Sequence, residues 1–273
     1  MTMPAPVIGA ALPVEQLPTY RNWLLEKNRD IELQSFTRAE VLMGDWRPLA
    51  QEAVRLLDGH TGRRGIHGPF WGVPLNSMDP EVQEVVARRI DQALDVCAAI
   101  SATQMVLHSP YTKWMRNNFD AVPGWRDGTL SSVQDTLKGP VARAEDLGVT
   151  LVIENIEDCG PEERVDLAAS FNSPAVKVSL DTGHARCAEY MFGAPPVDYH
   201  VLAAGKDLAH IHLQDVDGYA DRHWSVGEGS VSWHRLFAAL QETGATPHMI
   251  LELRDYAKIP ASMTWLEREG LGQ

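Results

Sequence analysis

The chain has 273 residues, a hydrophobic fraction of 44% and a formal net charge of −13 at pH 7. This apolar content is enough for a large core, but no apolar run of about 18 residues predicts a membrane span. Nucleic-acid binding draws most of its affinity from Lys and Arg that replace counterions on the phosphate backbone. The acidic balance and the lack of a basic run therefore argue against a nucleic-acid partner.

The N-terminal segment MTMPAPVIGAALPVEQ carries no basic residue, and its short apolar run is typical of a first strand rather than of a secretory leader. The cysteines, Cys97, Cys159 and Cys187, are odd in number, far apart and without a CxxC pair. We therefore expect free thiols rather than a disulfide framework or a thiolate zinc site. Together these features predict a cytoplasmic enzyme with no membrane association.

Short runs of β-branched and apolar residues recur along the whole chain and alternate with longer amphipathic segments. Each run has the length and the flanking turn residues of a buried strand. The predicted strands are Val7–Ala11, Asp30–Ser35, Arg64–His67, Thr103–His108, Thr150–Asn155, Val176–Asp181, Ala209–Gln214 and Met249–Leu253.

The segments between these runs predict helices. Apolar residues recur at helical spacing over Pro80–Ile100, and Asp79 is suited to cap the N-terminus of this helix. Helices are also expected over Thr129–Leu147 and Ser232–Thr243, each of which is followed by a glycine suited to a helix C-terminus.

Strand–helix alternation repeated in this way predicts a parallel sheet that closes into an α/β fold, the (β/α)₈ TIM barrel, and we expect a single domain over residues 1–273. An open doubly wound sheet is the alternative, but no GxGxxG motif follows the first predicted strand. In a TIM barrel the active site lies at the carboxyl ends of the strands.

Four apolar runs end at or near a side chain that binds metal ions, namely Glu154, Asp181, His212 and Glu252. In a barrel these strand ends meet, and three carboxylates would repel one another and raise their pKa values without a cation between them. Three carboxylates and one imidazole are mostly hard ligands that suit Mn²⁺, Mg²⁺ or Co²⁺, with Zn²⁺ as a further candidate. The pattern therefore predicts a divalent metal ion at the barrel mouth.

The loops after the third and fourth predicted strands are rich in aromatic residues. Flat rings beside a polar site suit the apolar face of a sugar, but the same side chains can simply pack the loops, and the sequence favours neither interpretation. The residues concerned are Phe70, Trp71, Tyr111, Trp114 and Trp125.

The most specific motifs of the chain are SLDTGHA, which contains Asp181, and DRHWSVGEGSVSW, which begins at Asp221. IEN at Glu154, HIHLQD around His212 and ILE at Glu252 accompany them. By these motifs the chain resembles, over most of its length, the xylose isomerase-like TIM barrels, which include sugar isomerases and epimerases, inosose dehydratase and endonuclease IV. The resemblance implies an enzyme for a small carbohydrate or polyol-derived substrate.

In the epimerases of this family, residues matching Glu154, Asp181, His212 and Glu252 bind one metal ion, and the resemblance implies that Glu154 and Glu252 are also the acid–base pair. The ion polarises the carbonyl of a hydroxyketone. One carboxylate then removes the proton next to the carbonyl, which leaves an enediolate, and the other returns it. Return to the same carbon is epimerisation, return to the adjacent carbon is isomerisation, and loss of a β-hydroxyl is dehydration.

The resemblance gives two roles to a further group of polar residues. In sugar-acting relatives, histidines at matching positions line the pocket and bind substrate hydroxyls, whereas in endonuclease IV they hold additional metal ions. The acidic charge, the short acidic loop before DRH and the lack of basic DNA-probing loops argue against an endonuclease. The residues concerned are His67, His108, His184, Asp221 and His223.

Several other side chains are candidates for a place at the site. Glu32 resembles an inward-facing glutamate of the family, with either a structural hydrogen-bonding role or a direct one. Arg254 lies two residues after Glu252, so that on a strand both would point to the same face, where Arg254 would orient Glu252 or meet an anionic group. Trp71 and Arg222 are further candidates for substrate contacts.

We therefore predict a sugar isomerase or epimerase that uses one divalent ion, with Mn²⁺ as the preferred metal. A dehydratase or another carbon–oxygen lyase acting on a keto-sugar or keto-inositol is the alternative, and an endonuclease IV-like trinuclear zinc phosphodiesterase is the second. A non-catalytic barrel is disfavoured because the acid–base pair is intact. Family members often form dimers or tetramers, so the resemblance is compatible with a homo-oligomer.

Overall fold

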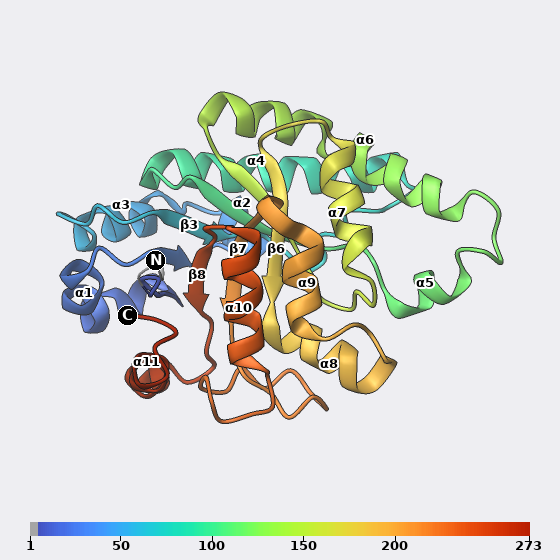
Figure 1. Ribbon diagram of the computed structural model, residues 1–273. Helices are drawn as coiled ribbons and strands as arrows, with labels where there is room; N and C mark the ends of the chain where they lie inside the picture. The colour runs from blue at the N-terminus through green and yellow to red at the C-terminus, as the bar shows by residue number, and fades with distance from the viewer. Residues whose placement is uncertain (1–4) are drawn as a thin grey trace.

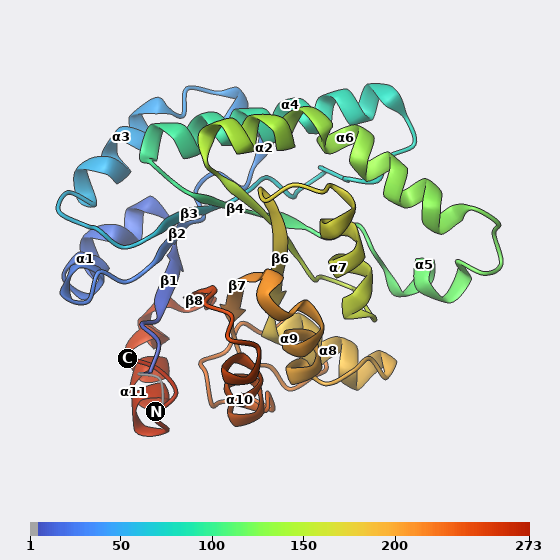
Figure 2. The same ribbon diagram turned by 45° about the horizontal axis from the view of Figure 1, so that its top comes forward.

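Parallel strands close into a barrel in which each strand is hydrogen-bonded to the next and the last strand pairs with the first. The computed structural model describes residues 5–273. Helices surround this barrel on the outside (Figures 1 and 2). The strands are β1 (Gly9–Leu12), β2 (Ile31–Leu33), β3 (Arg64–His67), β4 (Gln104–His108), β5 (Thr150–Glu154), β6 (Val176–Asp181), β7 (Leu208–Leu213) and β8 (His248–Leu251).

The helices lie between the strands along the chain and cover the outside of the barrel. Short 3₁₀ turns at Val14–Gln16, Gly205–Asp207 and Tyr256–Lys258 complete the connections. The α-helices are α1 (Leu17–Glu26), α2 (Ala39–Met43), α3 (Arg47–Leu56), α4 (Pro80–Ile100), α5 (Lys113–Asn118), α6 (Trp125–Leu147), α7 (Pro161–Ser170), α8 (Thr182–Phe192), α9 (Val197–Ala204), α10 (Trp233–Thr243) and α11 (Ile259–Arg268).

The predicted (β/α)₈ barrel is confirmed, and helix α4 has the predicted bounds. The Asp79 carboxylate caps α4 by accepting a hydrogen bond of 2.9 Å from the backbone N–H of Glu81. Helix α6 begins at Trp125 and not at Thr129. The sequence did not reveal this first turn because it is largely exposed and carries no apolar periodicity. Helix α10 begins at Trp233, one residue later than predicted.

The predicted strand bounds are correct for β3 and β6, whereas the other strands start or end one or two residues away from the prediction. The largest errors, of two residues each, lie at the start of β1 and at the ends of β2 and β8. After β8, for example, the N–H of Glu252 still donates to the carbonyl of Leu213 at 3.2 Å, but the residues that follow leave the sheet. These strand ends therefore belong to the loops of the barrel mouth.

Apolar side chains fill the space between the sheet and the helices and form one large core. The three cysteines are buried free thiols, as expected. The packing is close at Gly9 of β1, where a Cβ atom would lie 1.9 Å from the carbonyl oxygen of Asp30, so that only glycine allows the chain before β2 to come so near. This core holds the strands, and hence their carboxyl ends, in fixed positions.

The two ends of the described chain lie side by side next to α1 and α11 (Figure 1). The N–H of Ile8 donates to the carbonyl of Gln273 at 3.0 Å, and the N–H of Gln273 donates to Pro6 at 2.9 Å. The predicted domain of residues 1–273 begins in residues 1–4, which lie outside the described residues.

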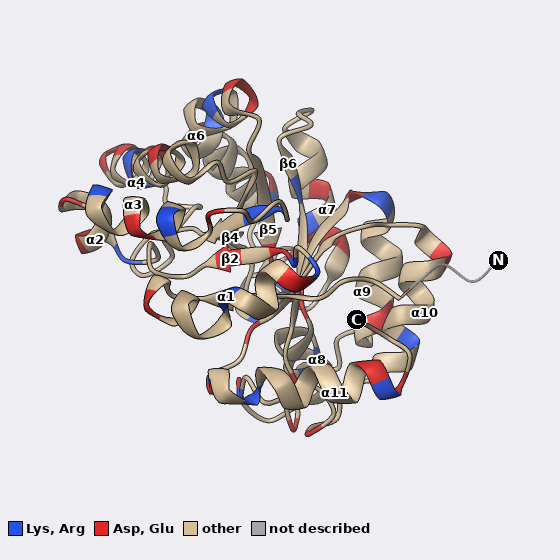
Figure 3. Ribbon diagram, turned by 90° about the vertical axis from the view of Figure 1, so that its left-hand side faces the viewer, with Lys and Arg blue, Asp and Glu red and all other residues tan. Residues whose placement is uncertain are grey.

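Charged residues of both signs alternate along the outer helices on the side of the molecule drawn in Figure 3, where Lys and Arg form no continuous stripe. Among the helices described, none combines the length and the apolar character that a membrane crossing requires.

Candidate metal centre and active site

The carboxyl ends of consecutive strands carry a group of metal-binding side chains. Glu154 is the last residue of β5, Asp181 is the last residue of β6, His212 lies near the end of β7, and Glu252 directly follows β8. Each offers one ligand atom, and these atoms all lie within 4.8 Å of one another. The structure therefore brings together the residues that were predicted to hold a metal ion, and we call them the donor set.

The local fold of the sequence DTGH holds Asp181 in place. Its Oδ1 accepts a hydrogen bond of 2.7 Å from the backbone N–H of His184 and so caps the first turn of α8. Asn155, directly after β5, clamps the backbone of Asp181: its Nδ2 donates to the carbonyl at 2.9 Å, and its Oδ1 accepts from the N–H at 2.8 Å. The position of Asp181 is thus fixed by two neighbouring segments at once.

Glu154 and Glu252 both approach the same atom of His212, the ring nitrogen Nδ1. His212 Nδ1 lies 2.6 Å from Glu154 Oε1 and 3.4 Å from Glu252 Oε2. The other oxygen of Glu252, Oε1, accepts a hydrogen bond of 2.5 Å from Nε2 of Gln34, which follows β2. Nδ1 is therefore the atom of His212 that faces the donor set, and Gln34 decides which oxygen of Glu252 faces it.

Gln214, the residue after β7, bridges the donor set and the loop that follows. Its Nε2 donates to Asp181 Oδ1 at 3.1 Å and to Asp221 Oδ1 at 2.9 Å. Its Oε1 accepts from the backbone N–H of His223 at 2.9 Å, and His223 has a positive φ of 51° that is uncommon for a residue with a side chain. Gln214 therefore links the position of Asp181 to that of the Asp221–His223 segment.

We predict that Gly183→Ala destabilises the protein, because Gly183 packs against Gln214. A Cβ atom at this position would lie 2.4 Å from Gln214 Cδ. Gln214 is fully buried and hydrogen-bonded on both sides, so we expect this overpacking to lower the free energy of unfolding by about 1–3 kcal/mol. Urea unfolding measures the effect.

The matched control for this change is Gly139→Ala in the middle of α6. Nothing lies within 4 Å of a Cβ atom added there. An alanine in a helix interior is favoured over glycine by up to about 1 kcal/mol, so this variant should be as stable as the parent protein or more stable. Equal stability of the two alanine variants would contradict the role given to Gly183.

His67 of β3 and His108 of β4 lie next to the free oxygen of Glu154. Their Nε2 atoms are 3.6 Å and 3.5 Å from Glu154 Oε2, respectively, and 3.3 Å from each other. His67 donates from Nδ1 to the carbonyl of Gly68 at 3.0 Å, which leaves Nε2 directed towards the site. Glu154 thus has one oxygen at the donor set and the other at this pair of histidines.

His184, Asp221 and His223 form a third group, at the more open side of the site. Asp221 lies between the two rings, with Oδ1 at 3.5 Å from His184 Nε2 and Oδ2 at 3.0 Å from His223 Nε2. Both histidines use Nδ1 to contact backbone carbonyls, those of Asn155 at 2.9 Å and Glu252 at 3.0 Å, respectively. The Nε2 atoms therefore face the site, an orientation suited to a metal ion or a substrate hydroxyl.

Of the three carboxylates in the donor set, two have raised pKa values and one does not. Burial opposes ionisation of Glu154, but His212 and His67 outweigh it and hold the pKa of Glu154 well below its usual value. Burial raises the pKa of Asp181 and of Glu252, and the nearby histidines offset only part of this effect. Burial opposes protonation of His212, but Glu252, Glu32 and Glu154 outweigh it and raise the pKa of His212 well above its usual value. The site therefore attracts positive charge.

The donor set fits a divalent cation. Within residues 5–273, no Lys or Arg forms an ion pair with Glu154, Asp181 or Glu252, so their charge is met only by histidines. Three carboxylates and one imidazole offer mostly hard ligand atoms, which suit Mn²⁺, Mg²⁺ or Co²⁺ and also allow Zn²⁺. A cation here would replace the protons that the histidines otherwise carry.

The aromatic residues of the loops divide into two kinds. Tyr111 is buried and Trp125 packs against the core, so these two hold the loops in place. Phe70 stacks on His108 with ring centroids 4.3 Å apart, and Trp71 lies against Phe70 while remaining 66% exposed. Trp71 is thus at the rim of the site, where a substrate can reach its ring; Trp114 is also exposed.

The strand alternation from which the direction of Arg254 was predicted does not reach that residue. Strand β8 ends at Leu251, so the alternation of a strand does not continue to Arg254. Its Nη2 donates instead to the backbone carbonyl of Asp221 at 3.3 Å. Arg222 pairs with Asp217 at 3.0 Å.

Sequence reasoning missed the amide side chains that orient the carboxylates. Gln34, Asn155 and Gln214 each directly follow a predicted or observed strand, which places them at the barrel mouth. They were missed because an amide forms no recognisable metal motif. Their position at a strand end is the one signal that points to them.

Comparison with known proteins assigns a family to this arrangement. Residues 30–269 match the family model of the xylose isomerase-like TIM barrel. Fructoselysine 3-epimerase of Escherichia coli O157:H7 is 27% identical over 190 residues, which are 67% of this chain and 64% of that enzyme. The chain therefore spans less than two-thirds of the length of this relative.

Two solved structures share the barrel along nearly the whole chain. The protein TTHB071 of Thermus thermophilus, in a structure obtained after soaking with ZnCl₂, is 26% identical, with a TM-score of 0.73 over 97% of this chain and 99% of that one. A D-tagatose 3-epimerase-like protein has a TM-score of 0.76, with 21% identity and 96% of both chains covered.

Proposed function

This chain belongs to the xylose isomerase-like TIM barrel family, and we propose that it is a divalent-metal-dependent isomerase or epimerase of a sugar or sugar derivative. The observation that carries the proposal is the donor set, in which Glu154 and Glu252 both lie close to His212 Nδ1. The similarity to fructoselysine 3-epimerase supports a sugar-like substrate. A cytoplasmic location and the absence of a nucleic-acid partner remain predictions from the sequence.

We propose that all residues of the donor set hold the ion and that two of them also transfer a proton. Glu154, Asp181, His212 and Glu252 would hold one divalent ion, with Mn²⁺ as the preferred metal. When bound, the ion supplies Lewis-acid polarisation of a substrate carbonyl and stabilises the negative charge that develops on its oxygen.

Glu154 and Glu252 are the proposed acid–base pair. One carboxylate takes the proton from the carbon next to the carbonyl, and the electron pair of the C–H bond moves into the substrate to give an enediolate. The other carboxyl group returns a proton to the same carbon, which inverts it, or to the adjacent carbon, which exchanges aldose and ketose. Gln34 keeps Glu252 in position for this step through its hydrogen bond to Oε1.

The histidines around the pair are proposed to bind the substrate hydroxyls. His67, His108, His184 and His223 direct Nε2 towards the site, and each of these atoms can donate or accept one hydrogen bond. The rim residue Trp71 is proposed to cover the apolar face of the sugar. Loss of a β-hydroxyl from the same enediolate would make the protein a lyase, and the experiment below separates the two outcomes.

Incubation of the metal-loaded protein with ketoses, keto-inositols and keto-glycosides in D₂O tests the proposal. We expect deuterium at a carbon next to the carbonyl of the true substrate, detected by mass spectrometry and NMR, because the proton that is removed exchanges with solvent. Inversion without loss of water identifies an epimerase, whereas loss of water identifies a lyase. Absence of deuterium from every substrate, together with cleavage of abasic duplex DNA, would contradict the proposal.

A further inference from the structure

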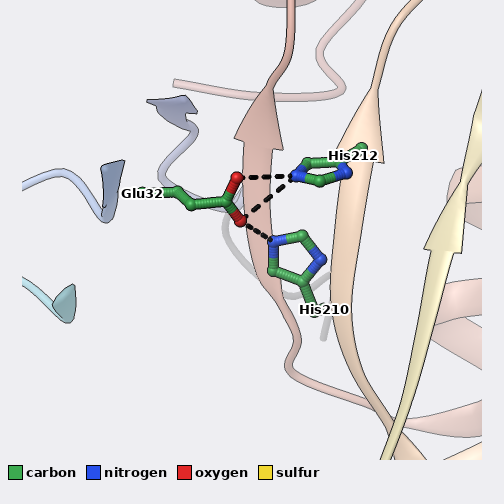
Figure 4. A group of neighbouring side chains, drawn as sticks. All are labelled: Glu32, His210 and His212. Carbon is green, nitrogen blue, oxygen red and sulfur yellow. Dashed lines mark hydrogen bonds and ion pairs between the residues drawn. The ribbon is translucent and has the colours of Figure 1, made fainter. Parts of the chain in front are cut away.

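A buried carboxylate, Glu32, lies in the interior of the barrel next to His212, at the ring nitrogen that faces away from the donor set (Figure 4). Glu32 belongs to β2 and reaches across the barrel to two histidines of β7. Its Oε1 lies 3.0 Å from His212 Nε2, and its Oε2 lies 3.1 Å from both His212 Nε2 and His210 Nε2. All three side chains are at most 2% exposed, so these polar atoms face one another and not solvent.

The neighbours of His212 fix the direction of its hydrogen bond to Glu32. His212 Nδ1 faces Glu154 at 2.6 Å and belongs to the donor set, so with that atom used as a ligand the proton sits on Nε2 and points to Glu32. Ser179 pairs with His210 in the register of β6 and β7, and its Oγ lies 2.8 Å from His210 Nδ1. On the other side of the ring, His210 Nε2 lies 3.1 Å from Glu32 Oε2.

We propose that Glu32 is a positioning residue for the metal centre, which acts by holding His212 with Nε2–H on the carboxylate and with the lone pair of Nδ1 directed at the ion. His210 and Ser179 hold Glu32 itself in place. This inference rests on the metal site of the proposed function and assigns residues that do not touch the ion. A carboxylate behind a ligating imidazole fixes both its ring orientation and its tautomer.

The cost of burying Glu32 favours this role over a purely structural one. A carboxylate in the barrel interior loses its hydration, and no Lys or Arg of the part of the chain that the structure describes pairs with it. Inward positions of TIM barrels are commonly filled by branched apolar residues, which would pack at position 32 without that cost. Packing alone therefore does not explain a carboxylate here, whereas orienting His212 requires an acceptor.

Glu32, His210 and Ser179 form a layer of polar side chains below the donor set, and strands β6 and β7 contribute residues to both. Ser179 and Asp181 are two residues apart on β6, and His210 and His212 are two residues apart on β7, so each pair points to the same face of its strand. Asp181 and His212, nearer the carboxyl ends of the strands, belong to the donor set, and Ser179 and His210 belong to the layer with Glu32. The two layers are therefore built by the same two strands.

The test is the affinity of the protein for Mn²⁺ or Co²⁺, measured by calorimetry on the metal-free protein. We expect Glu32→Gln to raise the dissociation constant about 10- to 100-fold, because the amide removes the charge and one of the two acceptor oxygens behind His212. The visible absorption spectrum of bound Co²⁺ should also change, since the imidazole is no longer held in one orientation.

The matched control is Glu163→Gln. Glu163 is also a buried glutamate, but it lies in α7 and pairs with Arg116 at 3.0 Å, away from the donor set. This variant can lower stability, yet it should bind metal with the affinity and the Co²⁺ spectrum of the parent protein. A general loss of stability would instead weaken binding in both variants.

Two further measurements keep the inference separate from the proposed function. If Glu32→Gln does not fold, His210→Phe replaces it, because this variant removes the close contact of His210 Nε2 with Glu32 Oε2 and should weaken binding by about 2- to 10-fold. Parent-like metal affinity and Co²⁺ spectrum in the folded variant would overturn the role of Glu32 while leaving the proposed function intact. No metal binding by the parent protein would overturn both.

Discussion

Replacing Glu154 or Glu252 by Gln is expected to lower turnover by about 10²- to 10⁴-fold, the usual contribution of a positioned acid or base. Each glutamine keeps the shape of the side chain and one oxygen that can still face the donor set. It cannot accept a proton from a carbon acid or return one to the product. Since both steps are needed in every cycle, either replacement alone should nearly abolish conversion of the substrate.

The measurement compares kcat for the substrate found by deuterium exchange with metal content and folding of the same preparations. Circular dichroism should show the parent fold in both variants, and Glu163→Gln, the matched replacement outside the site, should retain parent kcat. Substantial residual turnover in both Glu154→Gln and Glu252→Gln would rule out the acid–base assignment.

Removal of the metal is the second change for which we expect a large effect. Treatment with a chelator should abolish turnover, because without the ion the carbonyl is not polarised and its neighbouring C–H is not acidic enough for a carboxylate to remove the proton. Addition of Mn²⁺ or Co²⁺ should restore it. The core is built from apolar contacts away from the donor set, so the metal-free protein should keep its helical content.

The control for chelation is the metal-free protein returned to the same buffer without metal. Full turnover of that preparation would show that the reaction needs no metal and would contradict this part of the proposed function. Restoration by Zn²⁺ alone would correct the predicted metal and leave the mechanism unchanged.

The sequence predicts the barrel well because parallel strands buried on both faces produce continuous apolar runs. β3 and β6 have the predicted bounds. The errors at the other strands lie at their starts as well as at their ends, because the residue pattern does not mark where the backbone pairing begins and stops. Arg254 shows the consequence, since its expected direction depended on a strand that ends at Leu251.

The donor set could be predicted because each member ends or follows an apolar run, and the ends of the strands meet in a closed barrel. For Gln34, Gln214 and Asn155 the sequence offers only their position at a strand end, because the contacts that they make are not marked by any motif. The same holds for the layer of Glu32 and His210, which are 178 residues apart (210 − 32) and meet only across the interior.

Metal content is the most direct test of the claim that Glu154, Asp181, His212 and Glu252 hold one ion. Elemental analysis of the purified protein should give about one divalent ion per chain. Asp181→Asn should lower this content, whereas His108→Gln, which changes a neighbour outside the donor set, should not. About three zinc ions per chain, with a loss of metal in His108→Gln, would contradict the account and favour a multinuclear phosphodiesterase.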